Sequence, residues 1–200
     1  MLEKRFLLRT IVGLTALIAA SSVFARDMSI PYGWYVEGNL GSTYLSKKNY
    51  PGETSESGIG ANANAGYKFI PYLAAEVGYT QYAYTTVNTD AGTRAAKDKH
   101  SSYDLALKGI YPIMQTGIEV FGKLGAAHIM SDMQIKNTAA ATSLGLTENS
   151  HNEINVYFGA GAQYYFIPEL AFVVQWQRAN GDSSTGALDL FSGGLSFLVD

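Results

Sequence analysis

Residues 61–80 read Ala-Asn-Ala-Asn-Ala-Gly-Tyr-Lys-Phe-Ile-Pro-Tyr-Leu-Ala-Ala-Glu-Val-Gly-Tyr-Thr, two alternating runs joined at Pro71. Before the proline, apolar or small residues alternate with Asn, Gly and Lys; after it, Leu73 and Val77 alternate with Glu76 and Gly78. Alternation with a period of two predicts β-strands with two unlike faces. The short proline turn between the runs predicts that the two strands pair antiparallel.

The rest of the chain repeats this design. Aromatic-flanked proline turns recur at 69–72, 110–113 and 166–169, whereas long polar stretches fill 46–57, 85–100, 131–150 and 181–186. Short turns at one end and long polar loops at the other are typical of outer-membrane β-barrels. A soluble β-sandwich that binds a ligand in the periplasm is the alternative, but it gives no reason for that asymmetry.

Period-two alternation predicts eight strands, an even number that also favours a barrel. The predicted fold is all-β: an eight-stranded antiparallel up-and-down transmembrane β-barrel with short periplasmic turns and long extracellular loops. The expected strands are 34–45, 58–69, 73–84, 101–111, 117–130, 151–166, 170–179 and 187–199.

The first 25 residues have the pattern of a signal peptide. Lys4, Arg5 and Arg9 precede the apolar run 11–20, and Val23-Phe24-Ala25 offers a cleavage site. That run is shorter than the roughly 20 residues of a spanning helix, which disfavours an uncleaved anchor. We therefore expect a signal peptide at 1–25 and one outer-membrane barrel domain at 26–200.

Composition excludes several functions. The 200 residues contain no cysteine, so thiolate catalysis, disulfides and cysteine metal sites are absent. The chain has 17 acidic and 14 basic residues, of which one acidic and three basic residues lie within 1–25. The remaining 16 acidic and 11 basic residues give 26–200 a net charge of −5. A nucleic-acid partner is not expected, because it would call for a basic patch.

Five charged residues fall on the face opposite the large apolar residues, which predicts a polar lumen: Glu37, Glu76, Lys108, Glu119 and Lys123. Counting across the loop 85–100 places Glu76 opposite Lys108, and counting across a turn at 112–115 places Lys108 opposite Glu119. The predicted result is an ion-pair ladder on three neighbouring strands; the alternative is that trapped water solvates these charges. Four further polar side chains are expected in the lumen: Glu37, Lys123, Gln163 and Gln175.

Aromatic residues gather at both ends of the strands, as expected for rings at the two water–lipid boundaries. The predicted aromatic girdle comprises Trp34, Tyr72, Tyr111 and Phe166 at the short-turn end and Trp176 at the long-loop end.

The order of these motifs resembles the eight-stranded transmembrane domain of OmpA-type proteins. Residues 33–41 resemble its opening strand, the segments 66–72, 108–112 and 167–171 its periplasmic turns, and 121–125 its fifth strand. The resemblance spans about 33–199 and implies a lumen acid and base on strands 3 and 4, matched by Glu76 and Lys108. The family's alternative partners fall at Val173 and Gln163, so an exchange of ion-pair partners is not implied.

The last strand is similar to the terminal signal that the barrel-assembly machinery recognises. That signal places a polar residue, a glycine and two spaced hydrophobes, which Ser192, Gly194, Phe197 and Val199 match. Valine replaces the usual aromatic residue at the final position. The chain ends at strand 8, so the peptidoglycan-binding activity of longer relatives is not implied.

The sequence predicts no enzyme, cofactor or metal site. A lipid-modifying barrel enzyme is the second alternative, and its only candidate residues are His128, Ser131 and Asp132. His128 and Ser131 differ by an odd number of positions, so they should face opposite sides of a strand. Gly159-Ala160-Gly161 lies within a strand and opens no helix, so it does not indicate a nucleotide site.

The expected function is that of a small outer-membrane scaffold for envelope integrity or surface interaction, with at most a narrow, gated solute path. Expected partners are outer-membrane lipid and lipopolysaccharide, the barrel-assembly machinery, and a host or surface ligand at the loops. The expected location is the outer membrane of a Gram-negative bacterium, and the expected state is a monomer.

Overall fold

A computed structural model describes residues 32–55, 57–113 and 116–199. The predicted signal peptide at 1–25 lies outside the described residues. Among these residues no helix is long and apolar enough to cross a membrane.

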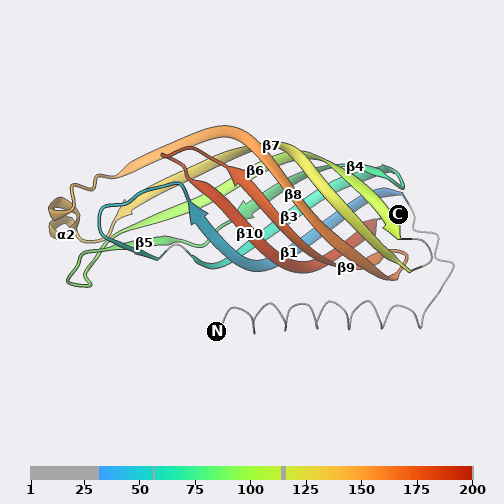
Figure 1. The fold of residues 1–200 in the computed structure, drawn as a ribbon, viewed down its shortest axis with the longest axis horizontal. Helices are drawn as coiled ribbons and strands as arrows, with labels where there is room; N and C mark the ends of the chain where they lie inside the picture. The colour runs from blue at the N-terminus through green and yellow to red at the C-terminus, as the bar shows by residue number, and fades with distance from the viewer. Residues whose placement is uncertain (1–31, 56, 114–115, 200) are drawn as a thin grey trace, which may run out of the picture.

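Eight long antiparallel strands form a closed barrel, as predicted (Figure 1). The ring order is β1-β3-β4-β6-β7-β8-β9-β10, and β10 pairs back with β1. The strands are β1 (Gly33–Ser46), β3 (Ser57–Ile70), β4 (Leu73–Gln81), β6 (Arg94–Ile113), β7 (Ile118–Ile135), β8 (Asn149–Ile167), β9 (Leu170–Asn180) and β10 (Ala187–Val199).

The prediction that 85–100 and 131–150 are loops was wrong in part. β6 begins at Arg94, β7 continues to Ile135, and β8 begins at Asn149, so these three strands extend beyond the others at the long-loop end (Figure 1). Two short strands, β2 (Glu53–Ser55) and β5 (Thr85–Asn88), and the helix α2 (Thr138–Ser143) complete this end. Polar composition concealed these strands, because strands that extend beyond the lipid layer do not need an apolar outer face.

Two of the three proline turns were predicted correctly. Pro71-Tyr72 and Pro168-Glu169 are the turns between β3 and β4 and between β8 and β9. Pro112 instead lies within β6 and pairs with Glu119. The chain reverses further on, where Gly117 has a φ of 70°, a conformation that glycine adopts without strain.

The two faces of the strands were predicted correctly. Leu107 is 59% exposed on the outside of β6, whereas the neighbouring Lys108 is 2% exposed inside the barrel. On β7, likewise, Leu124 is exposed on the outside and Lys123 is buried inside the barrel. The barrel therefore presents an apolar outer surface to lipid and keeps its charges within the lumen.

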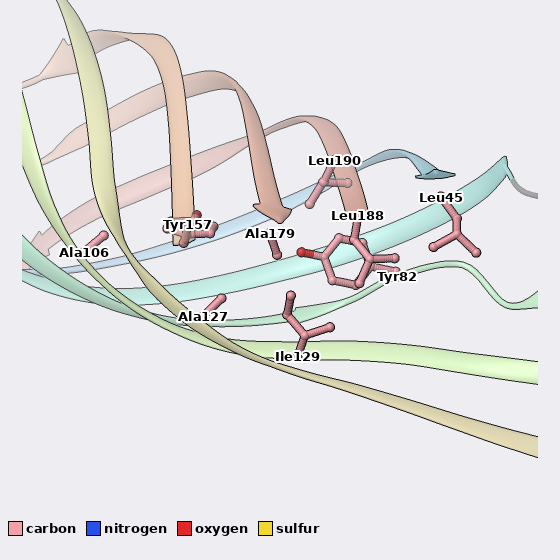
Figure 2. Close-up of a cluster of buried hydrophobic side chains, with 9 residues drawn as sticks. All are labelled: Leu45, Tyr82, Ala106, Ala127, Ile129, Tyr157, Ala179, Leu188 and Leu190. Carbon is pink, nitrogen blue, oxygen red and sulfur yellow. The ribbon is translucent and has the colours of Figure 1, made fainter. Parts of the chain in front are cut away.

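Apolar side chains fill both ends of the lumen. One cluster lies toward the long-loop end (Figure 2) and consists of Leu45, Tyr82, Ala106, Ala127, Ile129, Tyr157, Ala179, Leu188 and Leu190. The other lies toward the short-turn end and consists of Tyr35, Ala74, Ile110, Phe121, Tyr165, Ala171, Val173 and Leu198. An eight-stranded barrel has an interior just wide enough for such filling.

Candidate functional site

Four charged side chains form a network in the lumen. Lys108 Nζ lies 3.5 Å from a Glu37 oxygen and 3.7 Å from a Glu76 oxygen. Lys123 Nζ lies 2.5 Å from Glu76 and 3.9 Å from Glu37. All four residues are at most 4% exposed. The network spans the bore, because Glu37 stands on β1 and Lys123 on β7, which are diametrically opposite in the ring.

The predicted ladder on neighbouring strands was wrong in register. Ala74, not Glu76, lies opposite Lys108, and Lys123, not Glu119, lies opposite Lys108. Counting residues symmetrically across the two connections gave the wrong partners for two reasons. Residues 85–100 include paired strands, and the β6–β7 turn begins after Pro112. Lys108 still approaches Glu76, since both side chains point into the same narrow lumen.

Glu119 has a different basic partner, which sequence reasoning missed. Lys68 Nζ on β3 lies 2.7 Å from the Glu119 carboxylate on β7. Gln163 donates to Glu119 at 2.6 Å and accepts from Lys108 at 3.4 Å. The cavity left beside Lys68, Lys108 and Gln163 has a volume of only about 10 Å³, which barely admits one water molecule.

Amide side chains hold the Glu37 carboxylate in place. Asn39, Asn64 and Gln175 donate to one Glu37 oxygen at 2.8, 3.1 and 3.1 Å. Because the amide nitrogens point to Glu37, the orientation of these three side chains is defined by their hydrogen bonds. The predicted lumen residues Glu37, Lys123, Gln163 and Gln175 thus belong to one connected set of contacts.

A second polar cluster closes the outer mouth, which sequence reasoning had treated as loop. Lys48 follows β1 and donates to both Asp98 on β6 and Ser131 on β7, each at 2.7 Å. Tyr50 donates to the same Asp98 carboxylate at 2.7 Å. Because β1 and β7 are opposite in the ring, the segment after β1 is tied across the mouth.

His100 lies at the base of this cluster and is fully buried. Burial lowers the pKa of His100 to about 4, although the Asp98 carboxylate, 3.6 Å away, opposes that shift. For Asp98, burial works to raise the pKa, but His100, Lys48 and Tyr50 together outweigh it and hold the pKa below its ordinary value. At neutral pH the mouth therefore contains a neutral imidazole and a Lys48–Asp98 ion pair.

The predicted girdle residues lie on the outer surface. Trp34, Tyr72, Tyr111 and Phe166 are all more than half exposed at the short-turn end. Trp176 lies toward the other end, where its indole donates to Asp189 at 3.0 Å. Of the predicted assembly residues, Ser192 and Gly194 lie on the inner face of β10, and Phe197 and Val199 on the outer face.

The residues considered for catalysis do not converge. Ser131 is 2% exposed in the lumen and bonded to Asp98, whereas His128 lies on the outer face of β7. Asp132 is exposed and accepts from Gln134. Within the described ranges no three His, Asp or Glu side chains gather so as to hold a metal ion.

Two curated proteins illustrate the sequence similarity. Outer membrane protein P5 of Haemophilus influenzae is 31% identical over 105 residues, which cover 52% of this chain and 29% of P5. Outer membrane protein A of Salmonella typhi is 25% identical over 185 residues, which cover 88% of this chain and 50% of that protein. The chain spans half or less of the length of these relatives.

A solved structure shares the fold. The attachment invasion locus protein Ail of Yersinia pestis, in complex with the heparin analogue sucrose octasulfate, superposes with a TM-score of 0.53 at 14% identity. The superposition covers 82% of this chain and 98% of Ail. The model of the OmpA-like transmembrane domain matches residues 32–190. The chain therefore belongs to the OmpA-like transmembrane domain family and is a small β-barrel protein of the outer membrane of a Gram-negative bacterium.

Proposed function

We propose that this barrel is a membrane scaffold whose lumen network closes a narrow solute path. The supporting observation is the cross-bore arrangement of Glu37, Glu76, Lys108 and Lys123. The residual cavity next to this layer, beside Lys68, Lys108 and Gln163, has a volume of only about 10 Å³, hardly enough for one water molecule. A solute could pass only if these ion pairs separated.

Ion pairs can act as a gate because they are costly to break singly. Removing one partner of a buried pair leaves an uncompensated charge, at about 3–5 kcal/mol. Lys108 contacts two carboxylates, so its loss leaves the lumen with an excess of negative charge. That excess would favour water and cations in the bore.

Planar-bilayer recording tests the gate. We expect low conductance in the wild type and a higher open probability in Lys108→Ala. Lys47→Ala is the control, since Lys47 lies outside the lumen and donates to Asn180. Identical currents for wild type and Lys108→Ala would refute the gate and leave the scaffold function standing.

A stability comparison separates ion pairing from simple hydration. Lys108→Ala should destabilise the barrel more than the double variant Glu76→Gln/Lys108→Gln, because the single change leaves more unpaired charge. If trapped water alone solvated these groups, the single change would be the milder one. Urea unfolding in lipid vesicles measures both.

The extracellular segments are the proposed surface for partners. Ail shows that a barrel of this fold can bind a surface ligand, there a heparin analogue. In this chain β2, β5, α2 and the extensions of β6–β8 lie together at the long-loop end (Figure 1). Pull-down with variants that lack residues 89–93 or 138–148 tests which part binds a host or surface ligand.

Three further assignments belong to this proposal. The girdle positions Trp34 and Trp176 contact outer-membrane lipid and lipopolysaccharide, and the last strand is recognised by the barrel-assembly machinery through Phe197 and Val199. The protein acts as a monomer without a catalytic centre, and residues 1–25 direct its export. Loss of assembly in Phe197→Ala, scored by heat-modifiable gel migration, tests the recognition of the last strand.

A further inference from the structure

One carboxylate in the lumen differs from all the others. Asp104 lies on the inner face of β6 and is 5% exposed. Neither of its oxygens has a hydrogen-bond partner. Lys68, Lys108 and Lys123 are each within 4.0 Å of a glutamate, and none is that close to Asp104.

The charges of the described lumen do not balance. The spanning part of the bore holds four buried acids, Glu37, Glu76, Asp104 and Glu119, but only three buried lysines. The three lysines neutralise the three glutamates, so one negative charge remains at Asp104. A buried, unpaired carboxylate is strongly unfavourable, which creates a demand for one positive charge at this position.

The surroundings of Asp104 bring oxygen atoms together beside a residue that has no side chain. Gly78 lies opposite Asp104 on β4. A Cβ atom on Gly78 would lie 2.5 Å from Asn64 Oδ1 and 2.7 and 2.8 Å from the two Asp104 oxygens. The hydrogen bonds from Asn64 Nδ2 to Glu37 and Asn62 turn its carbonyl oxygen toward Gly78, and this oxygen also accepts from Asn62 Nδ2 at 2.9 Å. Three oxygens from two strands therefore converge in front of a glycine.

Two further lumen oxygens that can only accept have no partner. Asn39 Oδ1 and Gln175 Oε1 are also buried without a hydrogen-bond partner. The two amide orientations follow from bonds of their nitrogens to Glu37. The lumen wall thus has an excess of acceptor oxygens, which favours a hard cation and disfavours an anion.

We propose that Asp104 and Asn64 form a binding site for a monovalent cation inside the lumen. One charge is missing, so a monovalent ion neutralises the bore where a divalent ion would overcharge it. The Asp104 carboxylate supplies the charge and Asn64 Oδ1 an additional ligand, while the missing side chain of Gly78 lets the three oxygens converge. This site is independent of whether the lumen conducts.

Sodium dependence of folding tests the site. The free energy of unfolding is measured in lipid vesicles over a series of mixtures of NaCl and choline chloride at constant ionic strength. Above the dissociation constant, a tenfold rise in sodium should raise the folding equilibrium constant of the wild type tenfold. In Asp104→Asn the folding constant should be the same in both salts.

A second variant and a control make the result specific. Gly78→Ala keeps the carboxylate but places a methyl group among the three oxygens, so it too should abolish the sodium dependence. Asp132→Asn removes an exposed carboxylate and should keep the sodium dependence of the wild type. Heat-modifiable migration shows whether each variant folds.

Two outcomes overturn the proposal. If the wild type folds equally well in sodium and choline, water or a proton fills the site and no cation is bound. If Asp104→Asn keeps the sodium response of the wild type, the ion binds elsewhere.

Discussion

Acid should weaken the outer mouth through His100. The imidazole is fully buried, and burial lowers its pKa to about 4, whereas an unfolded chain titrates histidine near 6.5. Because the folded pKa lies below the unfolded one, the stability contribution is fully present above pH 6.5. It is lost as the pH falls, since only the unfolded chain then takes up the proton.

The size of the effect follows from the interval between the two pKa values. Each pH unit between 6.5 and 4 costs about 1.4 kcal/mol, so the wild type should lose about 3 kcal/mol by pH 4. One anion and one cation face the imidazole: the Asp98 carboxylate favours its protonation, and the Lys48 ammonium opposes it. The Lys48–Asp98 pair weakens only at still lower pH, because the pKa of Asp98 lies below its ordinary value.

Urea unfolding in lipid vesicles at several pH values measures this loss. His100→Gln should be less sensitive to pH between 6.5 and 4 than the wild type, since glutamine does not titrate. His151→Gln, which removes an exposed histidine of β8, is the matched control and should follow the wild type. Parallel curves for wild type and His100→Gln would refute the assignment, because other titrating groups contribute equally to both proteins.

Three other predictions concern the outside, the mouth and the topology. Leu107→Arg places a charge on the lipid face and should lower the free energy of unfolding in vesicles by about 2–4 kcal/mol. Leu107→Met should leave it nearly unchanged. Equal stability of Leu107→Arg and wild type contradicts the face assignment. Lys48→Met should remove the cross-mouth contacts, so that a cysteine placed at the buried position Leu190 reacts faster with an impermeant maleimide. The wild-type chain has no cysteine that would also react. An unchanged reaction rate argues against a closed mouth. On intact cells, protease should cut the exposed tip at 89–93 and spare the turn at Pro71; the reverse pattern would mean an inverted topology.

The strand faces could be predicted from the sequence because side-chain direction depends only on the period of two. Leu107 and Lys108 are adjacent in sequence, and their opposite environments follow from that rule alone. Register was less accessible, since it depends on where each turn begins. Pro112 looked like a turn residue, yet it pairs with Glu119 inside the β6–β7 ladder.

The partners within the lumen could not be predicted from pairing rules at all. Lys68 and Glu119 stand on β3 and β7, which are not neighbours, and they meet because the bore is narrow. The outer mouth was missed for a different reason: Asp98 and His100 were assigned to a polar loop. A signal was present, because the inward phase of Ser102 and Asp104 continues through both residues at every second position.

The same narrowness connects the lumen and the mouth. A side chain that enters an eight-stranded bore reaches the opposite wall, so polar residues on any strand can become partners. Lys123 reaches Glu37 across the centre in this way, and Lys48 reaches Ser131 across the outer mouth. The apolar cluster toward the long-loop end lies between the lumen network and the outer mouth (Figure 2), and the second cluster fills the short-turn end. Each charge therefore depends on a specific partner, which is why the one carboxylate without a partner, Asp104, is the position where a bound cation would have the largest effect on stability.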